Sequence, residues 1–150
     1  RSHYALSYRI GRYRDDRDHF ANKRTVGFPG LVTIDNQTLF TVSDYGVSEC
    51  ALEAILTDLD LSRESLNEID DINPKVSDVL VVESESSQPI VLLVMLWTCP
   101  DWFEPATRRL SLNDLRWMDM SHAPNNISDF DDWSAAAIES FAHTKAKRRW

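Results

Sequence analysis

Two apolar runs separated by a short polar break dominate the hydropathy pattern between residues 79 and 98. Both runs are rich in β-branched residues, which suit a pleated sheet. Pro89 would break a single long helix here, because proline lacks a backbone donor. The second run, residues 90–97, is apolar at every position, a pattern typical of a strand buried on both faces. We therefore predict a buried hairpin at the centre of a sheet.

Alternation and helical periodicity predict the elements on either side of this hairpin. Apolar residues alternate with polar or small ones over residues 4–10, which is the period of a half-buried strand. Residues 31–34 and 38–42 are predicted to form a second hairpin around a polar Asp-Asn-Gln turn. Apolar stripes at helical spacing predict amphipathic helices over residues 46–60 and 130–146.

Polar residues beside these helices predict where they begin. Asp44 or Ser48 is expected to cap the first helix, and Ser62 a shorter one that follows it. Ser128 is predicted as the cap of the last helix, with Asp131 in the position that a capping box uses.

Two further segments complete the predicted fold. Residues 99–105 form a proline-bounded loop, and the next apolar residues fit either a strand at 107–112 or a helix from Asn113. The whole pattern predicts a single α+β domain over residues 1–150. In this fold a mixed, largely antiparallel sheet of about five strands is covered by the two main amphipathic helices.

Composition adds an uneven distribution of charge. The chain has 150 residues, is 43% hydrophobic and carries a net charge of −8. Residues 1–24 hold seven Lys/Arg against three Asp/Glu, residues 25–106 hold two against fifteen, and residues 107–150 hold seven against six. An acidic middle therefore lies between a basic N-terminal segment, 1–24, and a basic C-terminal tip, 145–150. No apolar run approaches the roughly 20 residues of a membrane span, so we expect a soluble, cytoplasmic protein, with secretion as the alternative.

Sequence motifs give little support to an enzyme, a metal site or a cofactor. The chain contains no Gly-rich phosphate loop, G-x-S-x-G, HExxH or kinase signature. The acids at 129, 131 and 132 lack the glycine and terminal glutamate of a calcium loop. Those at 15, 16 and 18 are interleaved with arginines. We therefore expect neither metal nor cofactor.

Cys50 is the one candidate nucleophile. It lies near the start of the predicted helix, where the helix dipole lowers the pKa of a thiol, and His122 or His143 could act as the base. The alternative is that Cys50 is a small core residue whose pKa is raised by Glu49 and Glu53. A thiol-dependent hydrolase is therefore the third hypothesis.

The acidic middle and the missing catalytic signatures favour a protein-binding module, in particular a small acidic inhibitor or immunity-type protein that masks the basic surface of a partner. The expected partner-binding residues are acids and one aromatic pair: Glu49, Glu53, Asp58, Asp60, Glu64, Glu68, Asp70, Asp71, Trp102 and Phe103.

The second hypothesis is a nucleic-acid-binding domain that works through its basic ends. Arginine and lysine side chains would neutralise phosphates there, and neighbouring aromatic rings would stack on bases. The expected contacts are Arg9, Arg12, Arg14, Arg17, Lys145, Lys147 and Arg148. This hypothesis requires the two ends of the chain to meet in space.

Overall fold

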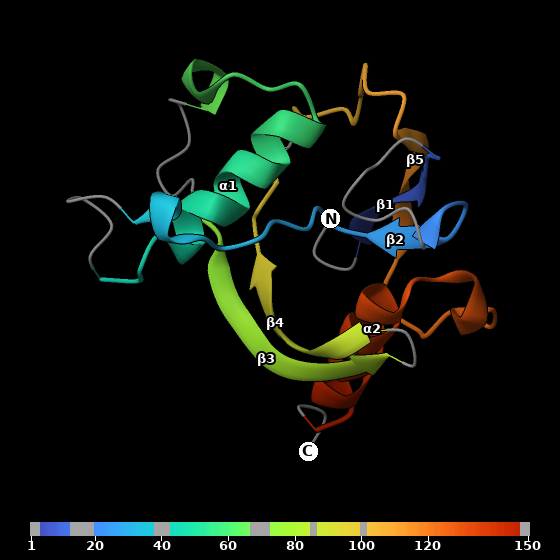
Figure 1. The fold of residues 1–150 in the computed structure, drawn as a ribbon. Helices are drawn as coiled ribbons and strands as arrows, with labels where there is room; N and C mark the ends of the chain where they lie inside the picture. The colour runs from blue at the N-terminus through green and yellow to red at the C-terminus, as the bar shows by residue number, and fades with distance from the viewer. Residues whose placement is uncertain are drawn as a thin grey trace. The chain divides into compact units, whose positions relative to one another are not determined.

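The computed structural model describes residues 4–12, 20–37, 43–66, 73–84, 87–99 and 102–147, with the backbone alone for residues 84, 87 and 143–147. The chain divides into two compact units. The first unit comprises Arg1–Gly27, Asp78–Val94 and Leu110–Trp150, and the second comprises Phe28–Ser77 and Met95–Arg109. The described ranges contain two α-helices and five strands (Figure 1), which confirms the α+β class. The strands belong to two sheets rather than to one.

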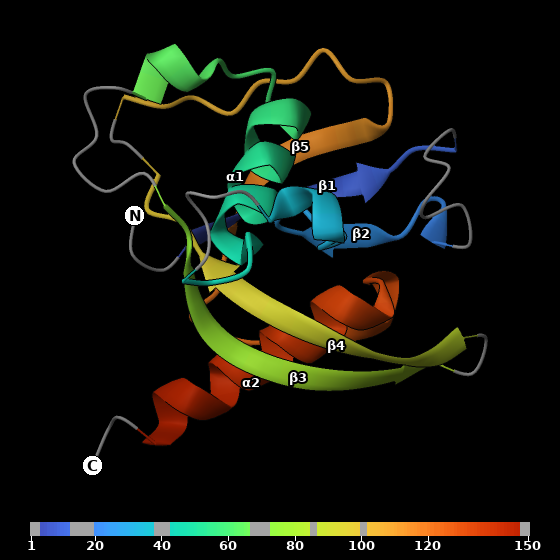
Figure 2. The same ribbon diagram turned by 60° about the vertical axis from the view of Figure 1, so that its left-hand side comes forward.

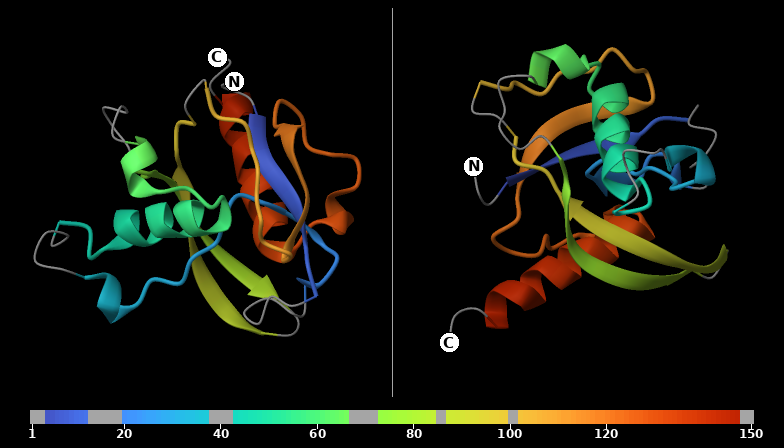
Figure 3. Two further views of the ribbon diagram at one scale, coloured as in Figure 1. Left: turned by 90° about the horizontal axis from the view of Figure 1, so that it is seen from above. Right: turned by 90° about the vertical axis from the view of Figure 1, so that its left-hand side faces the viewer.

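The first unit contains a three-stranded antiparallel sheet in the order β2-β1-β5. Its strands are β1 (Tyr4–Ile10), β2 (Arg24–Val26) and β5 (Leu112–Asp119), and β1 lies between the other two (Figure 3). The predicted strand at residues 4–10 is confirmed. It is more buried than simple alternation implies, because Ser7 is buried together with its apolar neighbours.

Helix α2 (Asp132–Lys147) packs against β2 in the same unit. The Ser134 hydroxyl accepts a hydrogen bond of 2.8 Å from the backbone N–H of Val26. The helix predicted at 130–146 is confirmed, but its predicted cap is wrong. Asp131 itself caps the helix by accepting the Ser134 N–H at 2.9 Å, and Ser128 lies in a separate 3₁₀ turn, η4 (Ile127–Asp129).

Strands β3 (Lys75–Ser84) and β4 (Ser87–Leu96) form a long two-stranded hairpin (Figure 2). The predicted hairpin is confirmed, but its predicted position at the centre of a buried sheet is wrong. Val79, Val81 and Val91 are 60%, 69% and 68% exposed, whereas Val82 is buried. A continuous apolar run does not require burial on both faces when the sheet has only two strands.

Helix α1 (Val47–Asp58) contributes Cys50, Leu52 and Ile55 to the core of the second unit and confirms the helix predicted at residues 46–60. The N-cap residue is Gly46 rather than the predicted Asp44 or Ser48. The Asp44 carboxylate, two residues earlier, accepts hydrogen bonds of 3.1 Å from the N–H groups of Gly46 and Ser48. The 3₁₀ turn η3 (Arg63–Leu66) follows, and the Ser62 hydroxyl accepts a hydrogen bond from within it.

The strand predicted at residues 31–34 is wrong. Residues 31–33 have no regular secondary structure and lead into a 3₁₀ turn, η2 (Ile34–Asn36). The predicted partner strand at 38–42 lies outside the described residues. The Asn36 side chain accepts a 2.7 Å hydrogen bond from the N–H of Thr33. Asparagine favours turns because its short side chain can replace a backbone acceptor in this way.

The segment that the sequence left open becomes β5, a strand that starts at Leu112. The helix alternative from Asn113 is therefore wrong, and the strand alternative is right in type but not in range. Before it, Thr107 donates a 2.9 Å hydrogen bond to the carbonyl of Asp58, the last residue of α1.

Among the described helices, neither is long and apolar enough to cross a bilayer.

Candidate functional site

A bulge in β5 is the most irregular feature of the three-stranded sheet. The register pairs Ser7 with Arg116 and Arg9 with Asn113, so β5 holds one more residue than β1 between these pairs. Asp114 lies in the bulge with φ +51°. Aspartate enters this left-handed region more readily than most residues. The bulge directs the Asp114 carboxylate toward Arg24 on β2.

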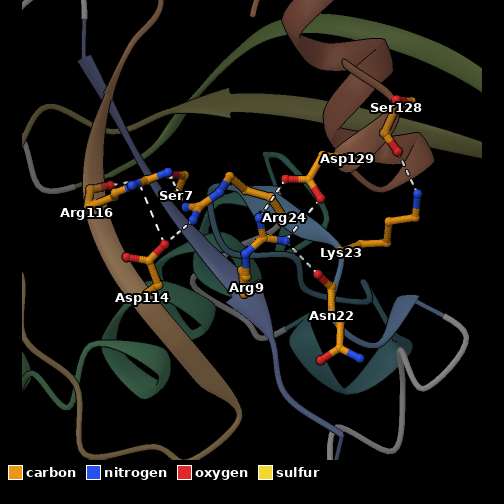
Figure 4. Close-up of polar contacts among 9 residues, drawn as sticks. All are labelled: Ser7, Arg9, Asn22, Lys23, Arg24, Asp114, Arg116, Ser128 and Asp129. Atoms are coloured by element: carbon orange, nitrogen blue, oxygen red, sulfur yellow. Dashed lines mark hydrogen bonds and ion pairs between the residues drawn. The ribbon is translucent and has the colours of Figure 1, made fainter. Parts of the chain in front are cut away.

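Arg24 is a buried cation, with only 3% of its surface exposed. One terminal nitrogen donates a 3.1 Å hydrogen bond to the hydroxyl of the buried Ser7, and the other forms an ion pair with Asp114. These side chains point toward one another across the sheet (Figure 4). A buried guanidinium requires such partners because an unpaired charge loses its hydration on burial.

Arg9 and Asp129 form a second, bidentate pair next to Arg24 (Figure 4). The two Nη–Oδ distances are 3.0 and 2.7 Å, and Arg9 also donates to the carbonyl of Asn22 at 2.9 Å. A third contact comes from Lys23, which donates a 2.6 Å hydrogen bond to the carbonyl of Ser128. Together these contacts connect β1 and the start of β2 to the turn before α2.

These pairs shift the titration of their members. Hydrogen bonding from Arg9 lowers the pKa of Asp129, and hydrogen bonding from Arg24 lowers the pKa of Asp114. The same contact with Asp129 raises the pKa of Arg9. A general base works best with a pKa near the operating pH, so the lowered pKa does not suit either carboxylate to that role. The network acts as a set of internal ion pairs.

The structure leaves the predicted nucleic-acid surface incomplete. Arg9 is committed to Asp129, and Arg12 is exposed. Arg14, Arg17 and Arg148 lie outside the described residues, and the side chains of Lys145 and Lys147 are not described. The meeting of the basic ends therefore stays a prediction.

All ten predicted partner-binding residues belong to the second unit. This unit contains twelve Asp/Glu against four Lys/Arg, which gives −8, and the first unit contains twelve of each. The division by structure thus assigns the whole net charge of the protein to the second unit. The sequence had indicated an acidic middle. It had not indicated which residues belong to the first unit, and therefore not that the net charge of that unit is zero.

The acidic residues of the second unit differ in how they are used. Asp58 is buried and accepts a 2.8 Å hydrogen bond from Arg109, so it cannot contact a partner directly. Ion pairs also involve Glu49, with Arg63, and Asp60, with Arg108. Glu68, Asp70 and Asp71 lie outside the described residues. Four carboxylates are exposed and lack an ion pair among the described residues: Asp35, Glu53, Glu64 and Glu104.

The aromatic pair of the second unit is divided between surface and core. Trp102 is 55% exposed, whereas Phe103 is buried. Their rings meet edge to face with centroids 6.3 Å apart. Trp102 is therefore available to a partner, and the buried ring of Phe103 packs against it.

Cys50 has the surroundings of a core residue. It is buried, and burial, followed by the charge of Glu53, raises the pKa of its thiol. A Cβ added to Gly30 would lie 3.1 Å from the Cys50 sulfur, so the backbone there covers the thiol closely. These surroundings disfavour a thiolate nucleophile. Neither Cys50 nor Cys99 forms a disulfide bond.

No cluster of metal-ligating side chains occurs in the described part of the chain. Asp129 is held by Arg9, and Asp131 caps α2. The acids at 15, 16 and 18 lie outside that part.

In comparisons with known proteins, no family model, curated protein or solved structure matches this chain.

Proposed function

We propose that this protein is a protein-binding module that uses the acidic surface of its second unit to bind a protein with a basic surface. In this proposal it acts as a small inhibitor or immunity-type protein, which masks a functional surface of its partner. The observation that carries the proposal is the segregation of net charge, which is −8 on the second unit and zero on the first.

Charge of one sign on one unit favours association with a partner of opposite sign. Complementary potentials accelerate encounter and exclude partners with the wrong charge. Glu53 and Glu64 are exposed without an ion pair among the described residues, so they can meet cationic side chains. Trp102 supplies an exposed aromatic side chain in the same unit, and such residues often dominate the binding energy of an interface.

The described residues give less support to nucleic-acid binding. Arg9, the best defined member of the predicted basic set, forms a bidentate pair with Asp129. Phosphate binding would have to compete with that pair. The first unit is also electrically balanced, so it lacks the excess of positive charge that drives counterion release from nucleic acid.

Affinity capture with matched charge variants tests the proposal. The immobilised wild type should retain basic proteins, and these should be released between about 0.1 M and about 1 M salt, where the screening length falls from about 10 Å to about 3 Å. Glu53→Lys with Glu64→Lys should abolish capture. Glu83→Lys with Glu139→Lys makes the same charge change at exposed positions of the first unit and should leave capture intact.

The results that would overturn the proposal are equally specific. Capture of acidic proteins alone, capture that salt does not weaken, or equal loss in both pairs of variants would each contradict it. Release of the captured material by nuclease would support the nucleic-acid alternative instead. The inhibitor role makes one further demand, since adding the protein should reduce the activity of the partner in proportion to binding.

A further inference from the structure

Four large apolar side chains of the second unit are exposed on segments that lie beside the N-terminal half of α1 or directly before it. Leu31, Ile34 and Tyr45 are 82%, 83% and 70% exposed, and Val32 is 42% exposed. They come from two short segments, 31–34 and the turn that precedes α1. A contiguous exposed apolar surface marks an interaction site more often than scattered single residues do.

Two close backbone approaches hold the segment that carries three of these residues against α1. A Cβ added to Gly30 would lie 3.1 Å from the sulfur of Cys50, and one added to Gly46 would lie 2.1 Å from the carbonyl oxygen of Asn36. The segment is therefore closely packed at both ends, at Gly30 and at Asn36. It runs beside α1 (Figure 1). Residues 31–35 are exposed, although the segment is closely packed at both ends.

The turn that presents Tyr45 is also fixed and is strained. Tyr45 has φ +56° and Gly46 φ +80°. Bulky side chains rarely adopt this left-handed conformation. The Asp44 carboxylate maintains it by accepting hydrogen bonds from the N–H groups of Gly46 and Ser48. With its ring largely exposed, Tyr45 gains little burial in return, and strain of this kind collects at functional positions.

We propose that Leu31, Val32, Ile34 and Tyr45 form the docking patch through which the second unit binds its partner. This inference rests on the proposed function and gives it a location. The patch is apolar but lies on the unit that carries all the net charge, and the exposed Asp35 lies within it. The complementary partner is a protein with an apolar pocket rimmed by lysine or arginine. Because close packing holds residues 30–36 and hydrogen bonds to Asp44 hold the turn, we expect little backbone conformational entropy to be lost on docking.

An NMR titration with two synthetic peptides tests this assignment. One peptide alternates leucine with lysine around a central tryptophan, and the other replaces every lysine with glutamate. The lysine peptide should shift the amide signals of residues 31–36 and 44–47, and the glutamate peptide should shift none. This result reports the location of binding independently of its strength.

Three variants separate the patch from general surface effects. Ile34→Ser and Tyr45→Asn should each raise the Kd for the lysine peptide about tenfold. Asparagine tolerates a positive φ, so Tyr45→Asn should remove the ring without unfolding the turn. Leu110→Ser is the matched control, because Leu110 is 89% exposed in the first unit, and its Kd should equal that of the wild type.

The possible failures are distinguishable. If the lysine peptide binds elsewhere on the second unit and Ile34→Ser has no effect, the patch is wrong and the proposed function stands. If neither peptide shifts any amide, the patch and the electrostatic function both fail. If the same signals shift with protein concentration alone and Ile34→Ser abolishes this, the patch binds a second copy of the chain, which would also overturn the proposal.

Discussion

Asp114 has the backbone conformation that makes the burial of Arg24 possible. Its positive φ and the bulge around it bring a half-exposed carboxylate to a cation that is almost fully buried. The pair is asymmetric, since the side chain of Arg24 is 4% exposed and that of Asp114 is 48% exposed. Most of the desolvation cost therefore falls on Arg24, and the partner that offsets it remains in contact with water.

We expect Asp114→Asn to lower the free energy of unfolding by about 1–2 kcal/mol at neutral pH. Asparagine preserves the size and the left-handed backbone, but it removes the charge opposite Arg24. The cost should be below the ~3–5 kcal/mol typical of a broken buried pair, because water reaches Asp114. Urea denaturation measures the change. Adding Asp114→Asn to Arg24→Met should cost almost nothing, and an equal cost in both backgrounds would show that the pair is not coupled.

The second residue-scale prediction concerns acid. Hydrogen bonding from Arg9 lowers the pKa of Asp129 in the folded protein, so the unfolded chain takes up this proton more readily. The resulting stabilisation is complete above the unfolded pKa, about 3.9, and is lost as the pH falls through the lower folded value. Asp129→Asn should therefore show a shallower loss of stability below about pH 4 than the wild type. Parallel denaturation midpoints from neutral pH down to acid would contradict this assignment.

At the scale of elements, the buried side chain of Asp131 caps α2. The Asp131 carboxylate accepts the N–H of Ser134 at 2.9 Å and its hydroxyl at 3.1 Å. The same hydroxyl lies 3.0 Å from that of Thr25 and accepts the N–H of Val26. The cap thus also orients the hydroxyl that joins α2 to β2.

We expect Asp131→Ala to destabilise the protein by about 2 kcal/mol, at the upper end of the range for helix caps. The reason is that the substitution also releases the Ser134 hydroxyl from its position beside β2. Asp132→Ala provides the control, because Asp132 is exposed at the next position and should change stability by no more than about 0.5 kcal/mol. Thermal denaturation followed by circular dichroism compares the two. Similar losses in both variants would indicate a helix-dipole effect rather than a cap.

The elements that the sequence predicts well are those whose pattern is set by local burial. The strand at 4–10 and the helices at 46–60 and 130–146 have clear periodicities, and the structure confirms them. Residues 31–34 have strand-forming side chains but become part of a turn, because Asn36 supplies the hydrogen bond that a neighbouring strand would have supplied. Propensity cannot detect such a local competitor.

The candidate sites were predictable only in part. Net charge is a sum over the sequence, so the acidic character of the second unit was visible before folding. The ion-pair network was not, because Arg24 meets Asp114 only through a bulge whose position depends on the pairing of β1 with β5. The docking patch was hidden for a related reason. Leu31 and Ile34 look like core residues in the sequence, and only the folded backbone shows that both side chains are exposed.

At the scale of the whole molecule, the unequal charge of the two units should make them respond differently to salt. The second unit has twelve carboxylates and only four cations to offset them, so repulsion among the carboxylates opposes its folding. The first unit instead gains from its internal ion pairs. Along α1, Glu49 and Glu53 are four residues apart, a spacing at which like charges destabilise a helix. Screening by salt should reduce the repulsion within the second unit and weaken the ion pairs of the first unit.

We therefore predict that raising NaCl from about 0.05 M to about 0.5 M increases hydrogen-exchange protection in α1 by about twofold, which is about 0.4 kcal/mol, and leaves β1 unchanged or less protected. Replacing Glu53 and Glu64 with glutamine should reduce the response of α1, because fewer like charges remain to be screened. The same replacement at Glu83 and Glu139, both exposed in the first unit, should preserve it. An equal rise in α1 and β1 would instead indicate a general salting effect on the folded state, and charge segregation would then have no measurable consequence for stability.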